Sequence, residues 1–179
     1  DWHVRRCRPC DSVARASSAA FAGTVPVGRV VGGSGRAAAR PCPGHRDMAI
    51  SVAQALPNAE LVVVTTPQPS ASDVAVRSGL VALQVPMKVR GVVENMSWYE
   101  HKGERLEIFG AGGGRRVSDQ LTETLGYDVP LLVQLPLDPD LREVGESGRP
   151  AVLNADGALR SDALGRTFRE LAEGLLRSE

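Results

Sequence analysis

Uninterrupted apolar runs alternate with amphipathic stretches along the chain after residue 47. Leu61–Thr66 and Lys88–Val93 are rich in valine and do not alternate polar with apolar positions. That pattern is typical of strands that are covered on both faces, as in a parallel sheet. A third apolar run, Pro130–Pro136, is bounded by prolines, which interrupt regular structure. The pattern therefore predicts a sheet of parallel strands.

Helical spacing occurs between and around these runs. Helices are predicted at Asp47–Leu56, Ser70–Leu83, Val117–Leu125 and Ala163–Leu176, with a short one through Leu141–Glu143. Asp47 is a suitable N-cap, and Gly126 suits the left-handed position after a helix. Helices that connect parallel strands by right-handed crossovers cover the faces of the sheet. The predicted fold class is therefore α/β, with a three-layer, doubly wound and mostly parallel sheet.

Polar residues follow the first two strands, where ligands of parallel sheets bind. Thr65 and Thr66 end the first strand, and Asn95 ends the second. The hydroxyls are suited to a phosphate or a water, and the amide is suited to a planar edge such as adenine. Three carboxylates lie nearby, and helix capping is the simpler interpretation of each: Asp47, Asp138 and Asp140.

Two glycine runs have the composition of phosphate-binding loops. Gly110–Gly114 precedes a predicted helix, so its backbone N–H groups are able to bind an anion. A hinge or a tight entry into the helix is the simpler interpretation. Gly32–Arg36 lacks the G-x-x-x-x-G-K-[ST] spacing and the lysine of a phosphate loop, and no strand is predicted before it.

Composition divides the chain into residues 1–46 and 47–179. The first segment has eight arginines and two aspartates, a net charge of +6, so the remainder carries −6 in a chain of net charge zero. It also holds all three cysteines and lacks leucine and isoleucine. It is interpreted as a disordered basic arm, as a metal or redox site at Cys7-Arg8-Pro9-Cys10, or as residues outside the natural reading frame.

Composition also disfavours several function classes. Zero net charge gives no general attraction to nucleic acid, and no run reaches the ~18 apolar residues of a membrane helix. No secretory signal peptide is recognised, so a cytoplasmic protein without membrane or nucleic-acid partners is expected. No Ser-His-Asp or Cys-His set is evident, since His101 is the only histidine after His45.

Three segments together resemble one known family: Asp47–Gln54, Val62–Gln68 and Gly91–Ser97. They read Asp-Met-Ala-Ile-Ser-Val-Ala-Gln, Val-Val-Val-Thr-Thr-Pro-Gln and Gly-Val-Val-Glu-Asn-Met-Ser. This combination is similar to the Mrp (ApbC) family of iron–sulfur cluster carriers, which are P-loop ATPases of the MinD/ParA-like superfamily. Ile108–Gly110 and Pro136–Glu143 extend the similarity.

The resemblance implies a P-loop NTPase domain that binds ATP and Mg²⁺, forms a homodimer and carries a 4Fe-4S cluster to apo client proteins. The positions that match the adenine side are Asn95, Pro136 and Asp138. The positions that match the switch region are Asp47, Thr65 and Thr66. A MinD/ParA-like positioning ATPase and a non-catalytic dimerising scaffold are the alternatives.

The sequence departs from the family at two places. Trp98–Phe109 contains no cysteine, although the family's cluster-binding Cys-x-x-Cys follows the Asn-Met-Ser segment. Upstream, the switch motif Leu-Leu-Leu-Asp-Leu-Pro-Pro-Gly-Thr-Gly is absent. A one-base shift of GC-rich codons for that motif reads Ala-Ala-Ala-Arg-Pro-Ala-Pro-Gly-His-Arg, which differs from residues 37–46 only at Cys42.

We therefore hypothesise that residues 1–46 are an out-of-frame translation and that 47–179 are a C-terminal portion of the NTPase domain, truncated with respect to the family. The sequence contains no Walker A loop, so we expect impaired ATP hydrolysis. The gene sequence just upstream of codon 47 tests the frame hypothesis. It is wrong if no one-base insertion or deletion and no better upstream frame are found.

Overall fold

The computed structural model describes residues 27–32, 37–41, 59–85, 87–139, 141, 150, 152–154 and 156–176. They fall into two compact units, Asp1–Ala59 with Gln84–Met87, and Glu60–Leu83 with Lys88–Glu179. In the first unit, β1 (Val27–Gly32) and β2 (Ala37–Pro41) pair in antiparallel fashion. A strand therefore does precede the glycine run at Gly32, contrary to the prediction. The helix predicted at 47–56 lies outside the described residues.

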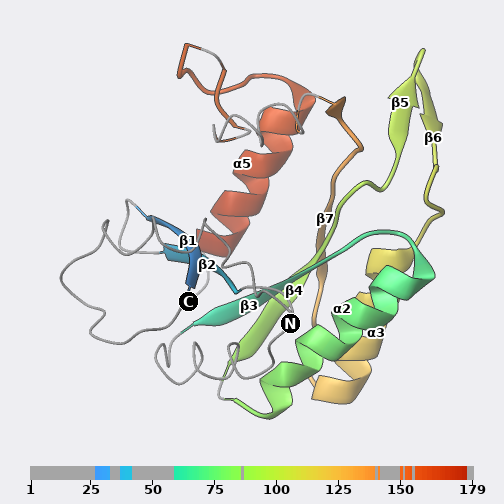
Figure 1. Cartoon of the computed structure of the whole chain (residues 1–179), viewed down its shortest axis with the longest axis vertical. Coiled ribbons are helices and arrows are strands. Elements are labelled where there is room, and N and C mark those ends of the chain that lie inside the picture. Colours follow the sequence, from blue (N-terminus) through green and yellow to red (C-terminus); the bar gives the residue numbers. More distant parts are fainter. Residues whose placement is uncertain are drawn as a thin grey trace, which may run out of the picture. The chain divides into compact units, whose positions relative to one another are not determined.

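The second unit is built on a three-stranded sheet in the order β3 (Glu60–Thr65), β4 (Lys88–Glu94) and β7 (Leu131–Gln134). Both neighbouring pairs are parallel, which confirms the predicted parallel sheet. The prediction placed each of these strands to within one or two residues. Figure 1 shows the three strands side by side, with their carboxyl ends at the same edge.

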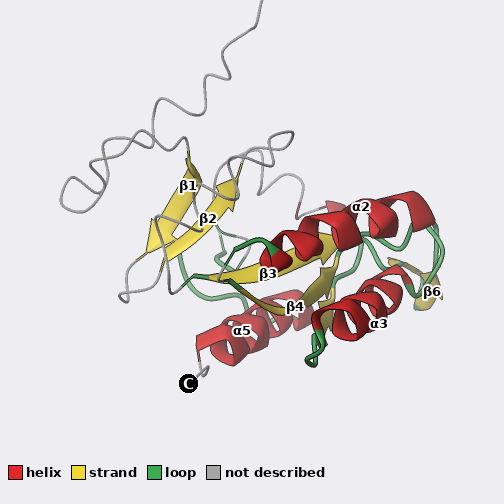
Figure 2. Ribbon diagram, turned by 90° about the horizontal axis from the view of Figure 1, so that it is seen from below, coloured by secondary structure: helices red, strands yellow, loops and turns green. Residues whose placement is uncertain are grey.

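Helices cover both faces of this sheet (Figures 1 and 2). The helical segments are α2 (Pro69–Gly79), the 3₁₀ turn η3 (Leu80–Leu83), α3 (Gly113–Leu125) and α5 (Ala163–Leu176). Residues of α2 and α3 pack together on one face, and α5 packs on the other. The three-layer, doubly wound arrangement is therefore confirmed.

Two clusters of buried side chains separate the layers. The cluster beneath α2 and α3 contains Val63, Ala75, Val89, Val92, Val117, Leu121 and Val129. The cluster beneath α5 contains Val93, Leu135 and Leu164, with Phe168 and Leu171 packed against it. Valine suits both layers because its branched side chain packs well on a pleated surface.

A bulge in β4 decides which of its side chains face which layer. Leu61 pairs with Val89 but Val62 pairs with Gly91, so one extra residue lies in β4. As a result Val89 and Val92 both point toward α2 and α3. Gly91 allows close approach of β7, since a Cβ there would lie 2.6 Å from Leu132 Cγ.

One prediction about β3 is wrong in part. The strand was expected to be buried on both faces, but Val64 is 61% exposed. The layer beneath α5 includes Val62 and does not extend to Val64. β4, in the centre of the sheet, is buried along almost its whole length, as predicted. The difference follows from position, because β3 lies at an edge of the three-stranded sheet.

Candidate functional site

Most of the residues predicted to bind a ligand lie at one edge of the sheet. We call this edge the strand-end rim, and define it as Thr65–Thr66, Glu94–Asn95, Gln134–Asp138 and the first turn of α3. Backbone hydrogen bonds join its parts: Asn95 N–H donates to Thr65 O at 2.8 Å, and Leu135 N–H donates to Glu94 O at 2.8 Å. The remaining predicted residue, Asp47, lies outside the described residues.

The two threonines are held by contacts within their own segment. Thr65 is buried, and its hydroxyl donates to Thr66 O at 3.2 Å. The Thr66 hydroxyl donates to Gln68 Oε1 at 2.6 Å. Both hydroxyl protons are therefore engaged internally, and Thr66, which is partly exposed, is the more accessible of the two.

Asn95 is held in a different way. Its carboxamide oxygen accepts the Met96 N–H at 2.9 Å, and Met96 takes the left-handed conformation with φ of 59°. The amide nitrogen has no hydrogen-bond partner among the residues that the structure describes. This partly exposed side chain therefore presents two N–H donors, which suit an acceptor such as a ring nitrogen of a base.

The loop after β7 carries the other two adenine-side candidates, Pro136 and Asp138. Both are partly buried. Backbone bonds fix the loop beside the segment after β4, since Ser97 N–H donates to Leu135 O at 2.9 Å and Leu137 N–H donates to Trp98 O at 2.6 Å. The loops after β4 and β7 therefore lie next to one another.

The glycine-rich turn before α3 is a tight helix entry. The helix begins at Gly113, four residues before the predicted start at Val117. A Cβ on Gly113 would lie 2.6 Å from Pro67 O and 2.7 Å from Thr66 O. The first turn of α3 therefore packs directly on the end of β3, which requires glycine.

The N–H group of Gly114 is already bound by an anion from within the chain. It donates to Glu94 Oε2, while Glu94 Oε1 accepts Gln134 Nε2 at 2.7 Å. The anion-binding interpretation of this turn therefore applies to an internal carboxylate. Glu94 is not among the site residues predicted from the sequence, although a charged residue at the end of an otherwise apolar run was the available sign.

The segment where the resemblance placed cluster-binding cysteines forms a hairpin instead. β5 (Tyr99–His101) and β6 (Glu104–Leu106) pair in antiparallel fashion and project from the rim (Figure 1). The Arg105 guanidinium lies 4.4 Å from the centre of the Trp98 ring. Among the described residues, no group of three histidine, cysteine or acidic side chains is placed to hold a metal ion.

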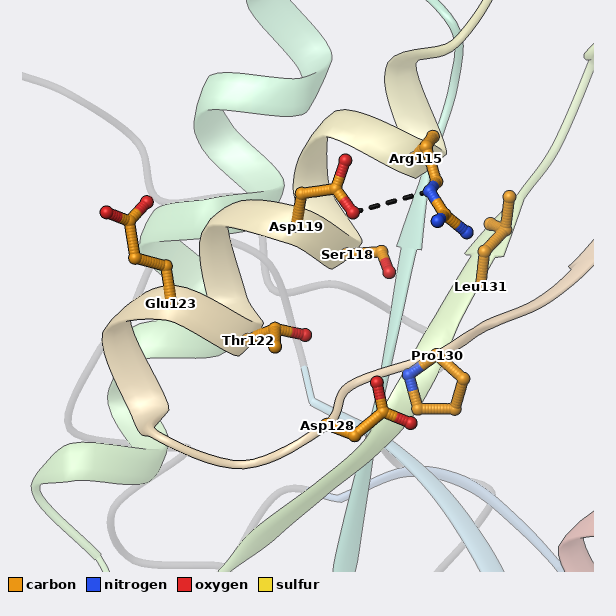
Figure 3. A pocket seen from close by; sticks show the side chains of 8 residues that line it. All are labelled: Arg115, Ser118, Asp119, Thr122, Glu123, Asp128, Pro130 and Leu131. Atoms are coloured by element: carbon orange, nitrogen blue, oxygen red, sulfur yellow. Dashed lines mark ion pairs between the residues drawn. The ribbon is translucent and has the colours of Figure 1, made fainter.

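A hollow in the described part of the chain lies away from the rim. It has a volume of about 470 Å³ and is lined by Arg115, Ser118, Asp119, Thr122, Glu123, Asp128, Pro130 and Leu131 (Figure 3). Arg115 and Asp119 form an exposed ion pair at 3.3 Å. Ser118 donates to Val129 O and Thr122 accepts Val129 N–H, so both hydroxyls hold the chain before β7. None of the predicted site residues lines this hollow.

A parallel sheet with helices on both faces and a polar rim at its strand ends defines a doubly wound α/β protein with a candidate ligand site at that rim. Residues 41–174 match the model of a family described as ParA, NUBPL iron-transfer P-loop NTPase. That match spans well over half of the chain, and the chain belongs to this family.

Curated relatives agree with this assignment. The chain is 51% identical over 134 residues to the iron-sulfur cluster carrier protein of Mycobacterium leprae, an alignment that covers 74% of this chain and 34% of the relative. It is 42% identical over 101 residues to the protein of the same name from Bacillus subtilis, covering 55% and 27%. The chain therefore spans about a third of the length of the relatives it matches. No helix in the described part is both long and apolar enough to span a membrane.

Proposed function

We propose that this chain provides the adenine side of an ATP site in a cytoplasmic iron–sulfur cluster carrier. Asn95 carries the proposal, because its oxygen is occupied by its own turn while its nitrogen, at the end of the central strand, is bonded to none of the described residues. Family membership and relatives named iron-sulfur cluster carrier protein support it. Pro136 and Asp138, on the neighbouring loop, would contact the opposite side of the base.

Mg²⁺–ATP is the cofactor that the family implies, and it would supply a cleavable phosphoanhydride bond. The rim fits the base because Asn95 presents hydrogen-bond donors there. It does not provide a phosphate cradle, since the Gly114 N–H is already bonded to Glu94 and the sequence has no Walker A motif. Walker A groups supply most of the binding and charge stabilisation of the phosphates. This 179-residue chain alone is therefore proposed to bind a nucleotide weakly and not to hydrolyse it.

The 4Fe-4S cluster is proposed as cargo that is delivered to apo client proteins by a homodimer. Trp98–Phe109 contains no cysteine, so the β5–β6 hairpin does not ligate a cluster through a Cys-x-x-Cys. The three cysteines, Cys7, Cys10 and Cys42, lie outside the described residues. A cluster that is delivered to client proteins would therefore be bound by residues outside the hairpin.

Calorimetric titration of the purified chain with ATP, together with a phosphate-release assay, tests the proposal. We expect weak binding and no turnover. Asn95→Ala should weaken binding about fivefold, the usual consequence of losing one hydrogen bond. Asn154→Ala, at an exposed asparagine outside the rim, is the matched control.

The outcomes separate the proposal from its alternatives. Equal affinity of wild type and Asn95→Ala would contradict the adenine-side role, and measurable turnover would contradict the absence of a phosphate site. A stable dimer that binds no nucleotide would indicate a scaffold. Sedimentation with liposomes would indicate a MinD/ParA-like positioning protein.

A further inference from the structure

Glu94 is a buried charged residue to which the proposed function gives no role. It is 1% exposed, ends β4 and directly precedes Asn95. Acidic side chains are rarely buried unless they are fully paired, because removing a carboxylate from water is costly. The partners of this carboxylate therefore indicate its role.

The two carboxylate oxygens bind two different elements. Oε2 accepts the N–H of Gly114 in the first turn of α3, and Oε1 accepts Gln134 Nε2 of β7 at 2.7 Å. The first N–H groups of a helix have no partner within the helix, and a negative charge there is favourable. Glu94 therefore fixes the start of α3 against the ends of β4 and β7.

The backbone of the same residue fixes the turn that follows. Glu94 O accepts both Leu135 N–H at 2.8 Å and the Ser97 hydroxyl at 3.2 Å. Asn95 and Met96 lie between these anchors. Met96 has a φ of 59°, which residues other than glycine adopt rarely and keep only where the surroundings enforce it.

We propose that Glu94 is the positioning residue for Asn95, and that its carboxylate, bound to Gly114 and Gln134, fixes the turn that directs the Asn95 amide. The value of this position for nucleotide binding rests on the proposed function. The position of the Asn95 amide does not rest on the proposed function, because it is a property of the chain without ligand. Glu94 acts through Asn95 and does not itself contact the base.

The partners of Glu94 allow a reciprocal test. Glu94→Gln keeps the size of the side chain but removes the negative charge at the start of α3, and its NH₂ group meets an acceptor only if the Gln134 amide turns over. The double variant Glu94→Gln/Gln134→Glu offers a carboxylate to that NH₂ group and returns the negative charge to the contact, now on β7. Glu123→Gln, at an exposed glutamate of α3, is the matched control.

The first measurement is the ¹H–¹⁵N NMR spectrum of the full chain without nucleotide. Glu94→Gln should shift or broaden the signals of the Asn95 side-chain NH₂, the Met96 amide and the Gly114 amide, and should leave Val117 and Leu121 unchanged. The double variant should restore the Asn95 and Met96 signals, and Glu123→Gln should resemble wild type. Unchanged Asn95 signals in Glu94→Gln, or no recovery in the double variant, would overturn the proposal.

The second measurement is ATP affinity of the same variants. We expect Glu94→Gln to bind about fivefold more weakly, as Asn95→Ala does, and the double variant to recover to within about twofold. A wild-type chain that does not bind ATP contradicts the proposed function only, because the NMR signals still decide the role of Glu94. Loss of affinity in Glu94→Gln with unchanged Asn95 signals would overturn the positioning role.

Discussion

The strand-end rim and the β5–β6 hairpin follow one another along the chain but are stabilised in different ways. The rim is held by buried polar contacts between elements distant in sequence, such as Glu94 with Gly114 and Gln134. The hairpin is held by local pairing and by an exposed contact between Arg105 and Trp98, and its Leu106 is 43% exposed. Changes in the rim should therefore affect the whole domain, whereas changes in the hairpin should remain local.

Among the changes in the rim and the hairpin, Gly113→Ala should give the largest effect. The added methyl would lie 2.6 Å from Pro67 O and 2.7 Å from Thr66 O, and backbone atoms cannot move aside without opening the end of β3. We expect a loss of about 3 kcal/mol in the free energy of unfolding, measured by urea denaturation.

Gly174→Ala is its control. Gly174 lies in α5 and a Cβ there would meet nothing within 4 Å. Alanine should stabilise that helix by about 0.5–1 kcal/mol. Equal stability of the two variants would show that the rim is not the rigid part of the domain.

Asp162→Ala tests a polar contact of intermediate exposure. Asp162 precedes α5 and accepts the Gly165 N–H at 2.8 Å, in the position of an N-cap. We expect a loss of about 1 kcal/mol by urea denaturation at pH 7. Asp162→Asn should retain most of the stability, because asparagine also caps helices. A loss in the free energy of unfolding as large as that of Gly113→Ala would contradict the expected order of these effects.

The Asp162 contact should also depend on pH. The hydrogen bond from the Arg160 side chain, followed by that from the Gly165 N–H, lowers the pKa of the Asp162 carboxyl below its ordinary 3.8. Its folded pKa is therefore lower than its unfolded pKa, so the stabilisation is present above pH 3.8 and is lost as the pH falls through the folded pKa. The difference in the free energy of unfolding between wild type and Asp162→Asn should shrink below pH 3.8, where the Asp162 carboxylate becomes protonated. It should stay constant between pH 6 and pH 8, because the carboxylate is fully charged there.

Arg105→Ala should have a smaller effect. Its guanidinium lies over the Trp98 ring in an exposed hairpin, where a cation–π contact contributes about 0.5–1 kcal/mol. Thermal unfolding should change little, and Trp98 fluorescence should change more clearly. Arg169→Ala, at an exposed arginine of α5, is the control. A loss above about 2 kcal/mol would mean that the hairpin is part of the cooperative core, since exposed substitutions rarely cost so much.

Leu106→Ala should have the smallest effect. This leucine is 43% exposed, so its removal should change the free energy of unfolding by less than about 0.5 kcal/mol. Leu121→Ala removes a fully buried leucine and should cost about 2–5 kcal/mol in the same urea titration. Similar losses for the two leucines would contradict the division between domain core and hairpin.

Much of the fold could be predicted because it follows from local pattern. Apolar runs predicted the three parallel strands, and the apolar spacing of residues 163–176 predicted α5 with its observed bounds. The start of α3 was predicted too late, since glycine has a low helix propensity and Gly113 and Gly114 are helical only because they pack on the strand ends. Long-range packing overrides local preference at that point.

The candidate site was only partly predictable for the same reason. The sequence by itself determined which polar residues follow each strand. It also determined the family, because a family is recognised from short motifs in their order along the chain. Only the tertiary structure decided that the Thr65 and Thr66 hydroxyl protons are engaged internally and that the Asn95 amide nitrogen is left without a partner among the described residues. It also placed Glu94 at the start of α3, a contact across 20 residues that no local pattern encodes.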